Sequence, residues 1–135
     1  MHGDFASLIC YESIFGEYVS RFTPKHAQWI CIITNDGWWG DSFGHQQHLS
    51  YARLRAIECR KSIVRSANTG ISALILPNGT ISSQLDYGEA GTIEGEIVKS
   101  DLITFYSVHG DYLGRLAYFL AFIYLLQMII INLKK

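Results

Sequence analysis

The chain has 135 residues, a formal net charge of −1 and a hydrophobic fraction of 49%. This length is sufficient for one domain with a real core. The balanced charge, without a block of Lys or Arg, argues against a nucleic-acid-binding protein. The three cysteines, Cys10, Cys31 and Cys59, are an odd number at wide and unrelated spacings, so they imply neither a disulfide framework nor a zinc site. We therefore expect single thiols and neither a metal nor another cofactor.

Residues 5–9 form the first predicted element, a short apolar strand, expected at the centre of a sheet, that runs directly into Cys10. A helix is predicted from Glu12 to about Phe22, so Cys10 lies at the bend between strand and helix. A thiol there faces the positive end of the helix dipole, which favours the thiolate and makes the sulfur a candidate nucleophile. The free backbone N–H groups of Tyr11 and Glu12 are suited to hold an oxyanion. The alternative is a small buried hydrophobic cysteine.

The predicted helix carries apolar residues at spacings of three and four, which indicates an inward face. These residues are Ile14, Phe15, Tyr18, Val19 and Phe22. Residues 29–34 predict a second buried strand, which ends in a glycine-rich loop over 35–44. Trp38 and Trp39 lie in this loop, at the end of a strand where sites commonly occur. They either plug the edge of the core or line an apolar substrate groove.

The pattern from about 46 to 61 predicts a helix with a stripe of mostly small residues, which allows close approach to a sheet. Its basic residues are expected mostly on the solvated face: Arg53, Arg55, Arg60 and Lys61. Residues 62–67 predict a further strand. Residues 72–76 predict another, which forms a hairpin with 80–85 because Asn78-Gly79 is a strong turn signal.

The last part of the chain changes in character. Residues 91–97 alternate and predict one more strand, and 105–111 predict a loop. Residues 116–133 contain only Gln127 and Asn132 as clearly polar residues. As a helix they span about 27 Å, close to the roughly 30 Å hydrocarbon core of a bilayer. We therefore predict a transmembrane helix, against the alternatives of a buried core helix or a peripheral amphipathic helix.

This pattern divides the chain into two predicted domains, 1–112 and 113–135, of which the second is a membrane helix with a short basic tail. Lys134 and Lys135 favour a cytoplasmic C-terminus, which puts the preceding part on the outer side of the membrane. Arg115 competes with this orientation.

Several motifs together resemble the nitrilase, or carbon-nitrogen hydrolase, superfamily. They lie at 9–12, 35–41, 47–49, 52–58 and 64–70. The tryptophan loop, the Arg-Ser-x-Asn-Thr-Gly strand end and the trailing apolar helix narrow the resemblance to the apolipoprotein N-acyltransferase family. It covers essentially the whole chain, but only the C-terminal part of the family's length. It implies an α+β fold, part of a nitrilase-type α-β-β-α sandwich followed by one transmembrane helix, in the bacterial inner membrane with the catalytic part on the periplasmic side.

The resemblance also implies a Glu-Lys-Cys triad in which Cys10 takes an acyl group from a phospholipid as a thioester. The α-amino group of the first cysteine of a diacylated apolipoprotein then accepts it. Tyr11 and Glu12 match positions that shape the site, Trp38 matches a site-lining tryptophan, and Trp39 lies beside it. Three further residues match motif positions that support the site from behind: Arg65, Ser66 and Asn68.

The Glu and Lys of the family's triad precede the cysteine and have no counterpart among these residues. We therefore expect the 135-residue chain to be inactive alone and a missing N-terminal half to exist. Two alternatives remain: a nitrilase-type amidase that acts on small amides, and a non-catalytic membrane-anchored remnant that needs a partner chain.

Other side chains allow different chemistry. A Cys10–His48 pair would make a thiol hydrolase dyad. His45 with His48, or His109 with Asp111, would give two ligands of a metal site, each without a third. Glu58 is expected to be a hydrogen-bonded structural carboxylate, and Cys31 and Cys59 are expected in the core.

Overall fold

The computed structural model describes residues 4–23 and 26–133. Its centre is a five-stranded sheet, whose strands lie side by side in chain order. They are β1 (Phe5–Ile9), β2 (Trp29–Thr34), β3 (Ser62–Ala67), β4 (Ser72–Ile75) and β5 (Ile81–Leu85). Strands β1, β2 and β3 are parallel to one another, whereas the β3–β4 and β4–β5 pairs are antiparallel. The predicted α+β class and the β4–β5 hairpin are confirmed.

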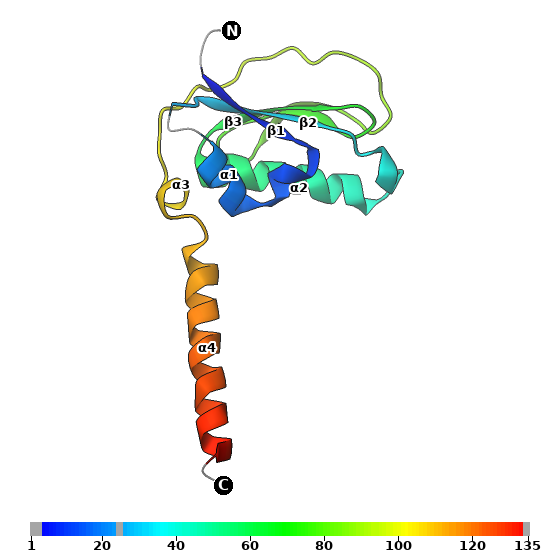
Figure 1. The fold of residues 1–135 in the computed structure, drawn as a ribbon. Helices are drawn as coiled ribbons and strands as arrows, with labels where there is room; N and C mark the ends of the chain where they lie inside the picture. The colour runs from blue at the N-terminus through cyan, green and yellow to red at the C-terminus, as the bar shows by residue number, and fades with distance from the viewer. Residues whose placement is uncertain (1–3, 24–25, 134–135) are drawn as a thin grey trace.

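One face of the sheet, the inner face, is covered by α1 (Gly16–Phe22) and α2 (Phe43–Cys59) (Figure 1). The strands alternate, so every second side chain faces these helices. The inner-face core includes Leu8, Ile30, Ile32, Ile63 and Ile75, all fully buried. Ala52 and Ala56 of α2 are also fully buried, which confirms that the stripe of small residues lets this helix lie close to the sheet.

The helix predicted from Glu12 is broken. A 3-10 helix, η1 (Cys10–Ile14), comes first, and α1 starts after Phe15, which is extended with φ −86° and ψ 92°. The break changes which residues face inward, because the helical spacing does not continue across it. Val19 is buried, but 56% of Phe15 and 46% of Phe22 is exposed, and Tyr18 is exposed too. The predicted inward face is therefore wrong for these three aromatic residues.

Three other predictions are corrected. Strand β1 pairs with β2 alone among the described residues and so lies at an edge, not at the centre. Residues 91–97 form no strand, and the predicted loop at 105–111 contains a short helix, α3 (Phe105–His109). Arg55 and Lys61, expected on a solvated face, are buried.

The segment 86–104 crosses the other face of the sheet, the outer face, without regular secondary structure (Figure 1). It is fixed by hydrogen bonds: Ser62 Oγ accepts from the Val98 N–H at 3.0 Å, and Lys61 Nζ donates to the Ser100 carbonyl at 2.9 Å. Burial lowers the pKa of Lys61. A buried ammonium needs such partners, because its charge has lost water. This explains why Lys61 leaves the solvated face.

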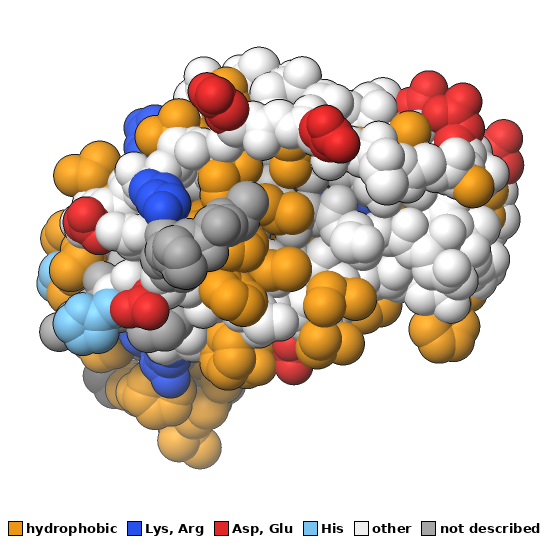
Figure 2. Space-filling model, turned by 90° about the horizontal axis from the view of Figure 1, so that it is seen from above, with side chains coloured by type: hydrophobic (Ala, Val, Ile, Leu, Met, Phe, Trp, Pro, Cys, Tyr) orange, Lys and Arg blue, Asp and Glu red, His pale blue; other side chains and the backbone are white. Residues whose placement is uncertain are grey.

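The outer face stays open beside β1 and β2. Phe5, Ile9 and Ile33 are each about half exposed there, and Cys31 is half-buried rather than in the core. Figure 2 shows hydrophobic side chains gathered in the middle of the molecule in the view onto this side. Contiguous exposed apolar patches are uncommon on protein surfaces and commonly mark contact sites, so this area is a candidate contact surface.

Helix α4 (Tyr112–Leu133) extends away from the sheet (Figure 1). Its 22 residues span about 33 Å, and none of its apolar window is buried. The helix is therefore not part of the core that the described residues form. By length and composition it can cross a membrane. Arg115 at its first turn forms an ion pair of 3.2 Å with Glu17 of α1.

Candidate active site

Cys10 lies at the bend between β1 and η1, as predicted. Its φ is +51°, and Arg60 is the other non-glycine residue of the described chain with a positive φ. This left-handed conformation costs an L-residue about 1–2 kcal/mol. It persists only where the surroundings fix it, and such strain is common at functional sites.

A closed ring of hydrogen bonds fixes Cys10 from two sides. Thr34 Oγ1 lies 3.3 Å from the sulfur and 2.9 Å from Asp36 Oδ1. Asp36 Oδ1 is 2.9 Å from His48 Nδ1, and His48 Nε2 is 3.0 Å from Ser13 Oγ. Ser13 Oγ donates to the Cys10 carbonyl at 2.9 Å, which completes the ring. Both the sulfur and the carbonyl of Cys10 are therefore connected to the same buried carboxylate.

Arg65 neutralises that carboxylate. Its side chain is fully buried, its Nη2 lies 2.7 Å from Asp36 Oδ2, and its Nη1 donates to the Ile71 carbonyl. Burial alone raises the pKa of Asp36, but hydrogen bonds from His48 and Arg65 and the Arg65 charge lower it to about 2. Asp36 is thus an acceptor at neutral pH, and His48 Nδ1 carries the proton between them.

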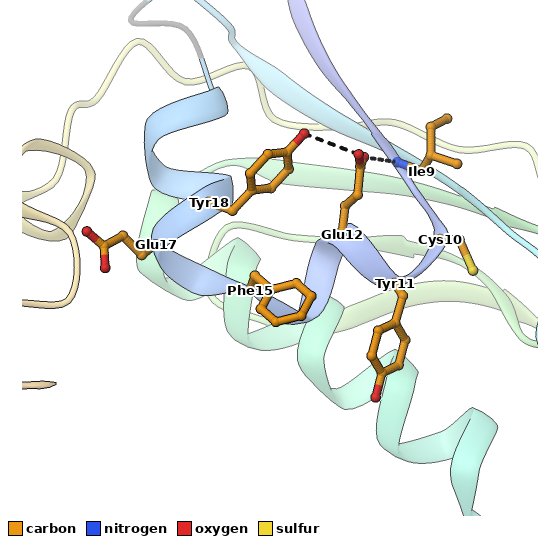
Figure 3. Close-up of a pocket in the computed structure, with 7 residues that line it drawn as sticks. All are labelled: Ile9, Cys10, Tyr11, Glu12, Phe15, Glu17 and Tyr18. Carbon is orange, nitrogen blue, oxygen red and sulfur yellow. Dashed lines mark hydrogen bonds between the residues drawn. The ribbon is translucent and has the colours of Figure 1, made fainter.

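An open groove with a volume of about 650 Å³ lies beside Cys10 (Figure 3). Its lining is mostly apolar and consists of Ile9, Cys10, Tyr11, Glu12, Phe15, Glu17 and Tyr18. The Glu12 carboxylate accepts from the Ile9 N–H at 2.7 Å and from Tyr18 Oη at 3.2 Å. In Figure 3 it points toward those two groups, while the half-buried sulfur points elsewhere. Glu12 thus binds the backbone at Ile9, the last residue of β1.

The two tryptophans and the residues predicted at the end of β3 do not all lie beside Cys10. Trp39 packs beside Tyr11 and His48, with ring centroids 6.1 and 5.5 Å apart. Trp38 is 77% exposed, and neither tryptophan is among the residues that line the groove. Ser66 and Asn68 are exposed at the end of β3, and the Asn68 N–H donates to the Thr34 carbonyl at 3.0 Å. Of the three supporting residues, Arg65 alone enters the buried ring network.

The histidine alternatives do not fit this arrangement. Asp36 and Ser13 engage both ring nitrogens of His48, so neither is left for the Cys10 sulfur and the dyad is not formed. The ring of His45 packs against that of Tyr87, with centroids 4.5 Å apart and an interplanar angle of 33°. Within residues 4–23 and 26–133, no three His, Cys, Asp or Glu side chains are grouped as metal ligands.

Glu58 is paired with a buried cation. Its carboxylate lies 3.1 Å from Arg55 Nε, and Arg55 Nη1 also donates to the Ile14 carbonyl at 3.3 Å. Burial raises the pKa of Glu58, and the Arg55 charge opposes that rise. Glu58 is thus hydrogen-bonded as predicted, because Arg55 Nη2 donates to its Oε1 at 3.2 Å.

Sequence reasoning missed Thr34, Asp36 and Ser13 as neighbours of Cys10. A signal was available for Thr34: if the strands 5–9 and 29–34 are parallel and in register, the residues after Ile9 and Ile33 lie side by side. The observed register pairs Ile9 with Ile33. The carboxyl ends of parallel strands therefore bring the thiol and the hydroxyl together.

A sequence profile of the carbon-nitrogen hydrolase family matches residues 2–106. The chain belongs to the carbon-nitrogen hydrolase family. Curated relatives named apolipoprotein N-acyltransferase include those of Bradyrhizobium diazoefficiens, 47% identical over 105 residues, and Rickettsia bellii, 43% identical over 128 residues. These matches cover 77% and 93% of this chain, but 19% and 26% of the relatives. The chain thus spans about a fifth to a quarter of their length.

The fold is also shared with a solved structure, that of an amidase from Nesterenkonia sp.. The TM-score is 0.52 at 21% identity, over 64% of this chain and 35% of the amidase. The predicted superfamily and the resemblance to apolipoprotein N-acyltransferases are therefore confirmed for this member of the family.

Proposed function

We propose that this chain is the C-terminal part of a membrane acyltransferase that moves a fatty acyl group from a phospholipid to the α-amino group of a lipoprotein's N-terminal cysteine. The observation that carries the proposal is the half-buried Cys10 sulfur, at a strained bend beside a mostly apolar groove. An acyl chain is an apolar ligand, and a groove of this kind suits it. The names of the relatives support the same reaction.

The reaction has two balanced steps. In the first, the Cys10 sulfur attacks the ester carbonyl of the phospholipid, a C–S bond forms, and the ester C–O bond breaks. The lysophospholipid leaves with a proton on its freed oxygen. In the second, the amine of a diacylated apolipoprotein attacks the thioester carbonyl, a C–N bond forms, the C–S bond breaks, and the proton that the amine loses returns to the Cys10 sulfur. Covalent catalysis of this kind divides one difficult acyl transfer into two easier steps.

The site residues have different roles in this proposal. Cys10 is the nucleophile, and the N–H groups of Tyr11 and Glu12 at the start of η1 face the developing oxyanion. Trp39, which packs beside Tyr11, and the exposed Trp38 next to it in the sequence give the acyl chain or its acceptor apolar surface outside the groove. Behind the sulfur, Arg65 holds Asp36, and the exposed Ser66 and Asn68 close the end of β3.

The chain is proposed to be inactive alone, because a general-base Glu and an oxyanion-stabilising Lys must come from outside residues 1–135. Removal of such groups commonly costs orders of magnitude in rate each. The open edge of β1 and the exposed Phe5, Ile9 and Ile33 support this idea, since a second sheet would cover them. The same exposed surface is also consistent with the alternative of a non-catalytic remnant, because a partner chain could cover it.

Helix α4 supports a location in the bacterial inner membrane. It is apolar along the length needed to span the hydrocarbon core. The two C-terminal lysines, which lie outside the described residues, favour a cytoplasmic end and so a periplasmic sheet. The boundary between the two predicted domains then falls at the start of α4, near Tyr112.

A graft tests the function. This chain replaces the matching region of the Rickettsia bellii apolipoprotein N-acyltransferase, and the purified membrane protein receives phospholipid and a diacylated lipopeptide. We expect an N-acylated lipopeptide with the graft and none with its Cys10→Ala variant or with the 135-residue chain alone.

The chain belongs to the carbon-nitrogen hydrolase family, so the same graft is also tested for hydrolysis of small amides. Amide hydrolysis that depends on Cys10, without lipopeptide acylation, would favour the amidase. Neither reaction from a folded graft would favour the non-catalytic remnant.

A further inference from the structure

The Thr34 hydroxyl has one proton and two acceptors within reach. It lies 2.9 Å from Asp36 Oδ1 and 3.3 Å from the Cys10 sulfur. A carboxylate oxygen can only accept, whereas a thiol can donate weakly. While Cys10 is a thiol, the hydroxyl proton therefore points to Asp36, and the sulfur faces the lone pairs of the Thr34 oxygen.

Asp36 does not depend on Thr34 alone. Arg65 Nη2 at 2.7 Å and His48 Nδ1 at 2.9 Å also donate to its carboxylate. These contacts remain if the Thr34 hydroxyl turns away, so the carboxylate is never left buried without donors. A thiolate, in contrast, gains a charge-assisted hydrogen bond when the hydroxyl turns toward it.

We propose that Thr34 is a positioning residue for Cys10, whose hydroxyl proton moves from the Asp36 carboxylate to the Cys10 sulfur when the thiol ionises and so stabilises the thiolate. The proton remains on Thr34 throughout, because rotation about the Cβ–Oγ1 bond redirects it. The inference rests on the proposed function, since it matters to acyl transfer only if Cys10 is the nucleophile.

Other polar groups near Cys10 are directed away from the sulfur. On η1, Glu12 is engaged by the Ile9 N–H and Tyr18 Oη, and the ring of Tyr11 packs toward Trp39. His48 of α2 reaches only the Cys10 carbonyl, through Ser13. The buried charges behind the sulfur are Asp36 and Arg65, and they meet it through Thr34. In the described parts of the chain, Thr34 is thus the hydrogen-bond partner of the sulfur.

Alkylation by iodoacetamide measures this directly, because the thiolate is the reactive form. The detergent-solubilised chain is labelled across pH 5–10, and mass spectrometry of peptides gives the rate for each cysteine. For Thr34→Val we expect the Cys10 profile to shift to higher pH and its rate at neutral pH to fall about tenfold. Thr34→Ser keeps the hydroxyl and should stay within about twofold of the parent at each pH.

Cys31 is an internal control, because it lies on the same strand but on the outer face, and its profile should not change. Fast labelling of the buried Cys59 would reveal that the Thr34→Val variant is unfolded. In that case the pH profile of Cys10 labelling is compared between Thr34→Ala and Thr34→Ser instead. Equal Cys10 profiles for parent and hydroxyl-free variants would overturn the proposal. This experiment reads thiol ionisation and not acyl transfer, so its failure would leave the proposed acyltransferase function standing.

Discussion

The two faces of the sheet depart from the usual distribution of side chains in different ways, because the inner face buries charged residues beside its apolar core and the outer face exposes apolar ones. The inner face buries Arg65 fully, together with Asp36 and His48 from the neighbouring loop and helix. The outer face leaves Phe5, Ile9 and Ile33 about half exposed. Buried charges are expensive to keep, and exposed apolar surface is unfavourable in water. Each face thus carries residues that stability alone does not explain.

The two faces correspond to two requirements of the site, a positioned thiol and a cover for the outer face. On the inner face, each oxygen of the buried Asp36 carboxylate has a donor, and the ring of hydrogen bonds reaches both sides of Cys10. The outer face is more open, because among the residues that the structure describes segment 86–104 alone crosses it. We infer that this chain supplies a positioned thiol and that other residues supply the cover.

Arg65→Ala should have the largest effect on stability. It leaves the buried Asp36 charge without its cation, and loss of one partner of a buried pair commonly costs about 3–5 kcal/mol. Chemical denaturation in mild detergent, followed by tryptophan fluorescence, measures the loss in free energy of unfolding. Arg65→Lys keeps the charge and should lose less. A change below about 0.5 kcal/mol for the Ala variant would show that the inner face does not depend on this pair.

The adjacent residues Ile32 and Ile33 give a matched test of the two faces. Ile32 is fully buried on the inner face, and Ile33 is 51% exposed on the outer face. We expect Ile32→Ala to lower the free energy of unfolding by about 2–4 kcal/mol and Ile33→Ala by less than about 1 kcal/mol. The same denaturation assay compares them. Equal losses would mean that the outer face is packed in solution.

Acid should weaken the inner face selectively. The pKa of Asp36 is about 2 in the fold and 3.8 in an ordinary environment, so its contribution is present above about pH 4 and lost as pH falls toward 2. A shift of this size corresponds to about 2 kcal/mol. Unfolding followed from pH 5 to pH 2 should show this loss for the parent. Asp36→Asn should lack this component, and an identical pH dependence of both proteins would contradict the assignment.

The sequence predicted local features better than spatial neighbours. The bend at Cys10, the Asn78-Gly79 hairpin and the apolar C-terminal helix depend on short-range patterns, and all are present. The strand predicted at 91–97 failed because alternation alone does not provide a partner strand. The inward face of the first helix failed because the chain changes from a 3-10 helix to an α-helix at Phe15, which breaks the spacing.

The ring around Cys10 shows why the rest of the site was not predictable. Thr34, Asp36, His48 and Ser13 are separated by up to 35 positions, and only strand register and the placement of α2 bring them together. Arg65 was identified from a motif, but its partner was not. Polar residues in a predicted core have no sequence signal that states which of them pair.

The most direct test of the account is the covalent intermediate itself. The graft into the Rickettsia bellii relative is incubated with phospholipid that carries a labelled acyl chain, without acceptor, and digested for mass spectrometry. The account predicts a hydroxylamine-sensitive acyl thioester on Cys10, absent from the Cys10→Ser variant and retained in Cys31→Ser. A folded, membrane-inserted graft with no label on Cys10, or with the label on another residue, would contradict it.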